Sequence, residues 1–121
     1  MKPGARSVVK EFERRLRKAR REMWRTVVRT DEELATLEAH QAGAPIEDAG
    51  TSTVAGVLSR LDGAERRLLD EIDAAQARLA AGTFGACERC AHAIPLARLR
   101  AVPTARLCVA CQRAAEGTAV P

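Results

Sequence analysis

Four cysteines near the C-terminal end of the chain have the spacing of a metal site. They form two short pairs, Cys87-x2-Cys90 and Cys108-x2-Cys111, with seventeen residues between the pairs. Each pair can bring two thiolates to one ion from a tight turn, and the gap lies within the range of four-cysteine zinc sites. Four sulfur ligands complete the tetrahedral shell that Zn²⁺ prefers and leave no open position for water or substrate. The sequence therefore predicts one structural zinc ion.

Two disulfides, or four free thiols, are the alternative for these cysteines. Residues 1–30 are charged throughout and lack the apolar core of a secretory signal peptide. This favours a reducing, cytoplasmic compartment, where such cysteines bind metal instead of pairing with one another. A redox-sensitive zinc switch is a further alternative, in which oxidation of the four thiolates expels the metal and unfolds the module.

The composition is typical of long helices. The 121 residues leave room for one domain, or for a small domain with one long appendage. Three aromatic residues, Phe12, Trp24 and Phe84, are few for a compact multilayer core. No stretch approaches the ~20 apolar residues that cross a bilayer, so we expect no membrane contact. The sequence also has no phosphate-binding glycine loop and no catalytic triad, and we expect that the protein is not an enzyme.

The apolar spacing predicts a long antiparallel helical hairpin of the coiled-coil type. Apolar residues recur in alternating steps of three and four over residues 7–41, and again over residues 53–81. Gly43 and Pro45 break the pattern between them, so residues 42–52 are expected to form the tip. The predicted seam residues are Val9, Phe12, Leu16, Ala19, Met23, Val27, Leu34 and Leu37, then Val54, Leu58, Leu61, Ala64 or Glu65, Leu68, Ile72, Ala75 and Leu79.

Each arm of the hairpin is expected to be one continuous helix. No glycine or proline interrupts the first arm, which predicts a helix of about 50 Å, with Thr30 as a weak point in its seam. A side-chain oxygen among residues 51–53 is expected to cap the second helix. Gly63 is expected inside that helix, and Gly82 is expected to end it.

The sequence thus predicts a mainly α protein in three parts. Residues 1–81 form the hairpin, residues 82–116 form the four-cysteine zinc module, and residues 117–121 form a flexible tail. Within the module we expect turns and short strands as far as Arg106, and a short helical turn that carries the second cysteine pair.

Charge is unevenly distributed along the hairpin. The net charge is +4, and ten basic residues between Arg6 and Arg29 face only three acidic ones in that stretch. Folding about the tip would place some of the basic residues opposite acidic residues of the second arm, which is one explanation of the basic stripe. The other is contact with phosphate or with an acidic protein, since lysine and arginine on one face attract polyanions. The residues that the hairpin would bring together are Arg17, Arg20, Arg21, Asp70, Glu71 and Asp73.

With these residues placed, the chain resembles the DksA/TraR family of C4-type zinc-finger proteins. The resemblance is densest from Gly82 to Glu116, and the hairpin upstream agrees with the family in length and position. The matching residues are Gly82, Thr83, Phe84, Gly85, Cys87, Cys90, Ile94, Pro95, Arg98, Leu99, Pro103, Thr104, Ala105, Leu107, Cys108, Cys111, Gln112, Ala115 and Glu116.

The resemblance implies a bacterial transcription regulator that binds RNA polymerase and not a promoter sequence. Family members insert the hairpin into the secondary channel of the polymerase, and some act together with the alarmone ppGpp. The zinc module grips the channel rim, for which Arg98, Arg100 and Arg106 are the candidate contacts here. We expect a monomer, one structural Zn²⁺ bound by the four cysteines, and no sequence-specific DNA binding. An interaction module that uses the same fold on another partner is the alternative.

The tip departs from the pattern of the family. An Asp-x-x-Asp-x-Ala motif of the best-known members aligns with residues 44–49, where Ala44 replaces the first aspartate and Glu47 the second. Glu47 and Asp48 are therefore the candidate acidic tip. Ala91 stands where glycine commonly follows the second cysteine, and a left-handed backbone there would cost alanine about 1 kcal/mol.

Overall fold

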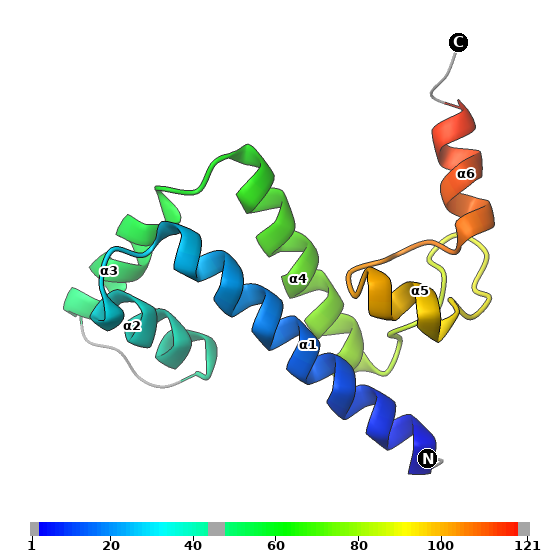
Figure 1. The fold of residues 1–121 in the computed structure, drawn as a ribbon, viewed down its shortest axis with the longest axis horizontal. Coiled ribbons are helices and arrows are strands. Elements are labelled where there is room, and N and C mark those ends of the chain that lie inside the picture. The colour runs from blue at the N-terminus through cyan, green and yellow to red at the C-terminus, as the bar shows by residue number, and fades with distance from the viewer. Residues whose placement is uncertain (1–2, 44–47, 119–121) are drawn as a thin grey trace. The chain divides into compact units, whose positions relative to one another are not determined.

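The structure is a computed structural model, and it describes residues 3–43 and 48–118 (Figure 1). Within these ranges the chain is helical and has no strand, only an isolated antiparallel bridge between Ala86 and Ala93. This confirms the predicted mainly α fold. No helix in the same ranges has both the length and the apolar character needed to cross a membrane. The helices are α1 (Pro3–Val27), α2 (Asp31–Gln41), α3 (Asp48–Leu58), α4 (Gly63–Ala81), α5 (Leu96–Ala101) and α6 (Val109–Thr118).

The chain divides into two compact units. The first unit combines Met1–Leu16 with Glu71–Pro121, and the second is Arg17–Asp70. Helices α1 and α4 each contribute residues to both units. The domain limits expected from the sequence follow the helical pattern and the cysteine motif, and not the compact units of the structure. These limits, 1–81, 82–116 and 117–121, stay a prediction.

The second unit has its own apolar core, formed by the end of α1, by α2 and α3, and by the start of α4. Most of the buried side chains are seam residues predicted from the three-four spacing, which confirms the spacing as a guide to burial. Trp24, Val57 and Leu69 are buried although they lie outside the predicted seam, which contained the partly buried Leu58 in place of Val57. The core residues are Met23, Trp24, Leu34, Leu37, Val54, Val57, Leu61 and Leu69.

The first predicted arm is not one helix, because a new helix begins inside it. Helix α1 ends at Val27, and Thr30 takes an extended backbone before α2 starts. The Thr30 hydroxyl accepts the Glu33 N–H at 3.1 Å, while the Glu33 carboxylate accepts the Arg29 N–H at 2.7 Å. This Thr-x-x-Glu arrangement closely resembles a capping box, which satisfies the free N–H groups of a helix start. The uninterrupted helix of about 50 Å was therefore wrong.

The second predicted arm is broken in the same way. Helix α3 ends at Leu58, and Asp62 and Glu65 cap α4 reciprocally. The Asp62 carboxylate accepts the Glu65 N–H at 2.7 Å, and the Glu65 carboxylate accepts the Asp62 N–H at 3.0 Å. Gly63 is thus the first residue of α4 and not an interior one. The predicted cap at residues 51–53 was also wrong, because α3 already begins at Asp48.

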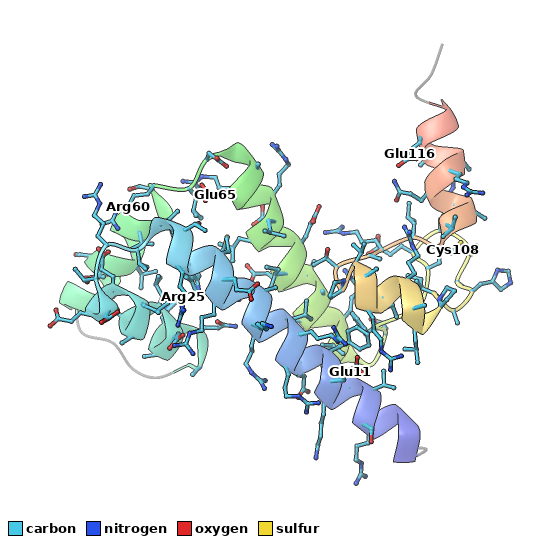
Figure 2. All side chains as sticks on the ribbon, in the orientation of Figure 1. Glu11, Arg25, Arg60, Glu65, Cys108 and Glu116 are labelled. Carbon is cyan, nitrogen blue, oxygen red and sulfur yellow. The ribbon has the colours of Figure 1, made fainter. Side chains whose placement is uncertain are left out.

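Arg60, which is labelled in Figure 2, joins the two breaks. Its guanidinium donates at 3.0 Å to the Val27 carbonyl, a group that has no helical partner because α1 ends there. It also donates two parallel hydrogen bonds, of 2.8 and 2.7 Å, to the two carboxylate oxygens of Glu33. Such a bidentate pair fixes geometry as well as charge. The ends of α1 and α3 and the start of α2 are therefore held by one side chain.

Helix α2 runs back along α1 instead of extending it. Arg21 lies nine residues before Thr30 and Glu38 lies eight residues after it, yet their side chains form an ion pair at 3.0 Å. Two consecutive helices run antiparallel when residues at nearly the same distance before and after their connection contact each other. The first arm of the predicted rod is consequently folded on itself within this unit.

In the first unit, the beginning of α1 packs beside the end of α4 in antiparallel orientation (Figure 1). Phe12 and Leu16 of α1 are fully buried, as are Ile72 and Ala75 of α4, and Leu79 is nearly so. All five are predicted seam residues. The hairpin prediction is thus confirmed for this part of the two helices.

Helix α4 ends as the sequence predicted. Gly82 has a positive φ of 77°, and the next N–H, that of Thr83, donates to the Arg78 carbonyl at 2.9 Å. This six-to-one hydrogen bond is the mark of a Schellman motif, in which glycine takes the left-handed position at no steric cost.

Leu68 was wrongly expected in the seam. It is 41% exposed, whereas its neighbour Leu69 is 9% exposed and belongs to the core of the second unit. Leu69 packs into the core of the second unit, which ends at Asp70, whereas Ile72, Ala75 and Leu79 of the same helix belong to the first unit and are buried as predicted. We expect Leu69→Ala to lower the free energy of unfolding by about 2 to 4 kcal/mol, as buried leucines do. The matched variant Leu68→Ala should lower it by less than about 1 kcal/mol. Urea titration followed by far-ultraviolet dichroism measures both, and equal losses would contradict this assignment.

The hydrogen bonds of the Glu33 carboxylate with Arg60 and with the Arg29 N–H predict that the stability of the fold depends on pH. Hydrogen bonds from Arg60, and then from the Arg29 N–H, lower the pKa of Glu33 from 4.5 to about 2. Because the pKa is lower in the folded state, the stabilisation is present above pH 4.5 and is lost as the pH falls toward 2. The thermal midpoint should therefore fall more over this window in the wild type than in Glu33→Gln. Thermal melts followed by circular dichroism at several pH values measure this difference. The control is Glu32→Gln, which keeps the hydrogen bonds of Glu33.

Candidate metal centre

The first cysteine pair lies on a tight turn just after α4. The Cys87 N–H donates to the His92 carbonyl at 2.8 Å, and the Ala91 N–H donates to the Cys87 carbonyl at 2.9 Å. These two bonds close the chain around Cys90, so that both thiols of the pair face the same side. Cys87 is 2% exposed, and Cys90 is half-buried.

The second pair belongs to α6 and to the residue before it. The Gln112 N–H donates to the Cys108 carbonyl at 2.9 Å, which makes Cys108 the residue from which α6 starts. The Glu88 N–H donates to the Arg106 carbonyl at 2.9 Å and so ties the first turn to the segment that leads to Cys108. The predicted helical turn for the second pair is confirmed, although α6 continues to Thr118.

The four thiols converge on one point. The Sγ atoms of Cys87, Cys90, Cys108 and Cys111 all lie within 4.8 Å of one another, and Cys90 Sγ is 3.9 Å from Cys108 Sγ. Tetrahedral ligation with Zn–S bonds of about 2.3 Å separates the sulfur atoms by about 3.8 Å. The cluster therefore has the size, the donor type and the ligand number of a closed zinc site.

The protons of the cluster are unevenly held. Hydrogen bonds from the backbone N–H groups of Cys108, Cys90 and Arg89 lower the pKa of Cys87 from 9.0 to about 6. The hydrogen bond to Cys108, together with burial, raises the pKa of Cys111 to about 12. Thiolates are the metal-binding form, so the low pKa of Cys87 favours metal binding at neutral pH, whereas the Cys111 thiol would release its proton to solvent as a metal binds.

Ala91 holds a backbone conformation that alanine disfavours. Its φ is +65°, which makes it the one described non-glycine residue with a positive φ. The position after the second cysteine therefore has the left-handed conformation for which the sequence predicted a cost, and this conformation costs an L-residue roughly 1–2 kcal/mol.

The segment between the pairs contains a helix that the sequence reading missed. Turns and short strands were expected there, but α5 occupies Leu96–Ala101. It follows Pro95, whose carbonyl accepts the N–H groups of Arg98 and Leu99 at 3.0 and 3.1 Å. Leu99 anchors α5 by burying all but 2% of its side chain. The pattern Pro-Leu-x-x-Leu, a proline followed by apolar residues three apart, was the available signal.

The three arginines proposed as rim contacts have different surroundings. Arg100 donates two hydrogen bonds, at 2.9 and 3.0 Å, to the carboxylate of Glu11 in α1. Arg98 is half-buried and donates to the Leu107 carbonyl at 3.0 Å. Arg106 is exposed and, with Arg98 and Glu88, lines a groove of about 520 Å³ beside the metal centre. Two of the three thus have structural contacts, and their role at a rim stays a prediction.

The predicted acidic tip is only partly within the described structure. Glu47 lies outside the described residues. Asp48 is the first residue of α3, and its backbone alone is described. The expected role of both side chains stays a prediction.

Comparison with known proteins agrees with the cluster. Residues 82–117 match the model of the prokaryotic dksA/traR C4-type zinc finger. DksA2 from Pseudomonas aeruginosa has a solved structure that is 30% identical in sequence, with a TM-score of 0.60, over 91% of this chain and 84% of that one. This chain belongs to the DksA/TraR family of C4-type zinc-finger proteins.

Curated relatives of this DksA/TraR chain are bacterial. It is 40% identical over 79 residues to an uncharacterised protein of Aquifex aeolicus, covering 62% of this chain and 54% of the relative. It is 42% identical over 52 residues to the RNA polymerase-binding transcription factor DksA of Haemophilus influenzae, covering 43% and 36%. The chain thus spans about half, or about a third, of the curated relatives it matches. Zinc is the metal of this C4-type finger, and the family fits a regulator of transcription.

Ala91→Gly should make the DksA/TraR metal centre more resistant to chelators. Glycine takes φ = +65° without strain, but it also loses more entropy on folding, so we expect a net gain of about 0.5–1 kcal/mol. The half-time of zinc transfer to a chromogenic chelator should lengthen about two- to fivefold. Gly85, with φ = +87°, provides the opposite control, because Gly85→Ala introduces the strain that Ala91→Gly removes. Faster zinc loss from Ala91→Gly would contradict the argument.

Proposed function

We propose that this protein is a zinc-dependent regulator that binds RNA polymerase directly. The observation that carries the proposal is the likeness of the fold to DksA2, which extends over most of both chains. A relative that matches over 52 residues is an RNA polymerase-binding transcription factor by name, which supports the same partner.

In this proposal the metal is structural. Cys87, Cys90, Cys108 and Cys111 hold one Zn²⁺, whose closed four-sulfur shell leaves no position for catalysis. Bound zinc supplies the folding energy of a module with few large buried side chains. The protein acts in the cytoplasm as a monomer, and it is not an enzyme.

The polymerase contacts follow from the resemblance. The hairpin enters the secondary channel with Glu47 and Asp48 toward the active centre, while Arg98, Arg100 and Arg106 lie toward the rim. The protein does not recognise a specific DNA sequence itself. The alarmone ppGpp is a candidate co-regulator. A carboxylate near a magnesium site acts through its position, so a shift of about 1 Å has a large effect.

The fold-back of α2 favours a second candidate, in which the same fold is an interaction module for another partner. The Arg21–Glu38 ion pair and the Arg60–Glu33 pair hold α2 against α1. In a straight rod, α2 would instead continue in the direction of α1. A pull-down with core polymerase separates the two candidates. Retention of the zinc-loaded protein supports the first, and its absence at high protein concentration supports the second.

The tip provides the test of regulation. Glu47 occupies the second acidic position of the family motif, so we expect Glu47→Ala to bind polymerase within a few-fold of the wild type but to lose most of its effect on initiation. Asp48→Ala should lose less and is the matched control. In vitro transcription with core polymerase and its housekeeping sigma factor, over a panel of promoters, measures both variants. Equal activity of Glu47→Ala and the wild type would show that the tip is not the effector.

A further inference from the structure

Helix α1 carries a face that is purely cationic. At about 100° per residue, six basic residues between positions 10 and 25 fall within an arc of about 100°. No acidic, aromatic or large apolar residue shares that arc in this stretch. All six side chains are exposed, and together they follow about 22 Å of one helix. The residues are Lys10, Arg14, Arg17, Lys18, Arg21 and Arg25.

This cationic face is opposite the side on which α1 is anchored. Phe12, Leu16 and Met23 are buried and project about 180° away from the centre of the arc, and the buried Trp24 lies about 20° beyond its edge. Because α1 is an unbroken helix over Pro3–Val27, the spacing of the charges follows from this one element. Arg25 is marked on the helix in Figure 2. Replacing residues of this face should therefore leave the cores intact.

Carboxylates of the chain neutralise little of this charge. Lys18 lies 3.9 Å from Glu22, but both side chains are largely exposed, at 78% and 66%. Arg21 pairs with Glu38 at 3.0 Å. Lys10, Arg14, Arg17 and Arg25 form no ion pair with any residue that the structure describes. Exposed pairs such as Lys18–Glu22 contribute little energy and exchange readily with another anion.

The composition of the face indicates the chemistry of its partner. Protein interfaces are enriched in arginine but are built around aromatic and apolar anchors and are depleted of lysine, whereas this face contains lysine and has no such anchor. A regular row of arginine and lysine matches the repeating phosphates of a nucleic acid, which arginine binds with paired hydrogen bonds. We propose that the cationic face of α1 binds the phosphate backbone of a nucleic acid without reading its bases.

This inference is independent of the proposed contacts with polymerase. It requires neither the acidic tip nor the zinc module, and it concerns free nucleic acid. Phosphate contacts release condensed counterions, so log K should fall by about 0.9 per contact for each unit of log salt on duplex DNA. Six contacts give a slope of about −5, and three fewer contacts make it shallower by about 2.7.

The test is fluorescence anisotropy with the zinc-loaded full chain. Labelled duplex DNA and labelled single-stranded RNA of arbitrary sequence, each of about 30 nucleotides in length, are titrated between about 50 and 200 mM salt. The variant Lys10→Gln/Arg14→Gln/Arg17→Gln should bind at least about tenfold more weakly at the lower salt, with the shallower slope. Dichroism verifies that it is folded. Binding to DNA, to RNA or to both supports the proposal and identifies the nucleic acid.

A matched variant controls for net charge. Arg67→Gln/Arg89→Gln/Arg113→Gln removes the same three charges from exposed positions outside the cationic face, and we expect its affinity to stay within about threefold of the wild type. An equal loss in both triple variants would overturn the proposal, because only net charge would then matter. Absence of binding to either nucleic acid at about 50 mM salt would also overturn it. Binding to polyglutamate without binding to nucleic acid would assign the face to an acidic protein instead.

Discussion

The second unit depends on the guanidinium of Arg60. A helix that stops leaves carbonyl groups without partners, and a helix that starts leaves N–H groups without partners. Arg60 satisfies a carbonyl at the end of α1 and binds the Glu33 carboxylate, which itself caps the start of α2. One cation thus connects three helix ends. Without the Arg60 guanidinium, the chain reversal between α1 and α2 would leave polar backbone groups without partners beside an apolar core.

The first unit is organised by a different constraint. The described residues after Gly82 bury Ile94 and Leu99, together with the small residue Ala105 and the thiol of Cys87. That is too little apolar surface to fix some thirty-five residues, and the backbone bonds of the turn are few. Convergence of four sulfur atoms replaces the missing core, and it explains why the backbone can hold Ala91 in a strained conformation. Metal ligation therefore stabilises the segment after Gly82, whereas burial of apolar side chains stabilises the packing of the long helices.

Sequence reasoning succeeded where a pattern was local and repeated. The three-four spacing identified Phe12, Ile72 and most of the buried residues, and the cysteine spacing identified the cluster. It failed where a second local signal competed with the first. The Thr-x-x-Glu and Asp-x-x-Glu boxes were present in the sequence, but continuous apolar spacing was given more weight, so both helix breaks were missed. The partner of Arg100 could not be foreseen, because Glu11 is 89 residues away and no local pattern pairs them.

The division of the chain has a consequence for the order in which the protein assembles. The second unit is a single stretch, Arg17–Asp70, whereas the first unit needs both Met1–Leu16 and Glu71–Pro121. Chains are synthesised at roughly 5–20 residues per second, with earlier segments available first. The inner unit can therefore become compact while its flanking segments are still apart. Glu11 and Phe12 must wait for Arg100 and Phe84, so capture of the metal and pairing of these segments follow the compaction of the inner unit.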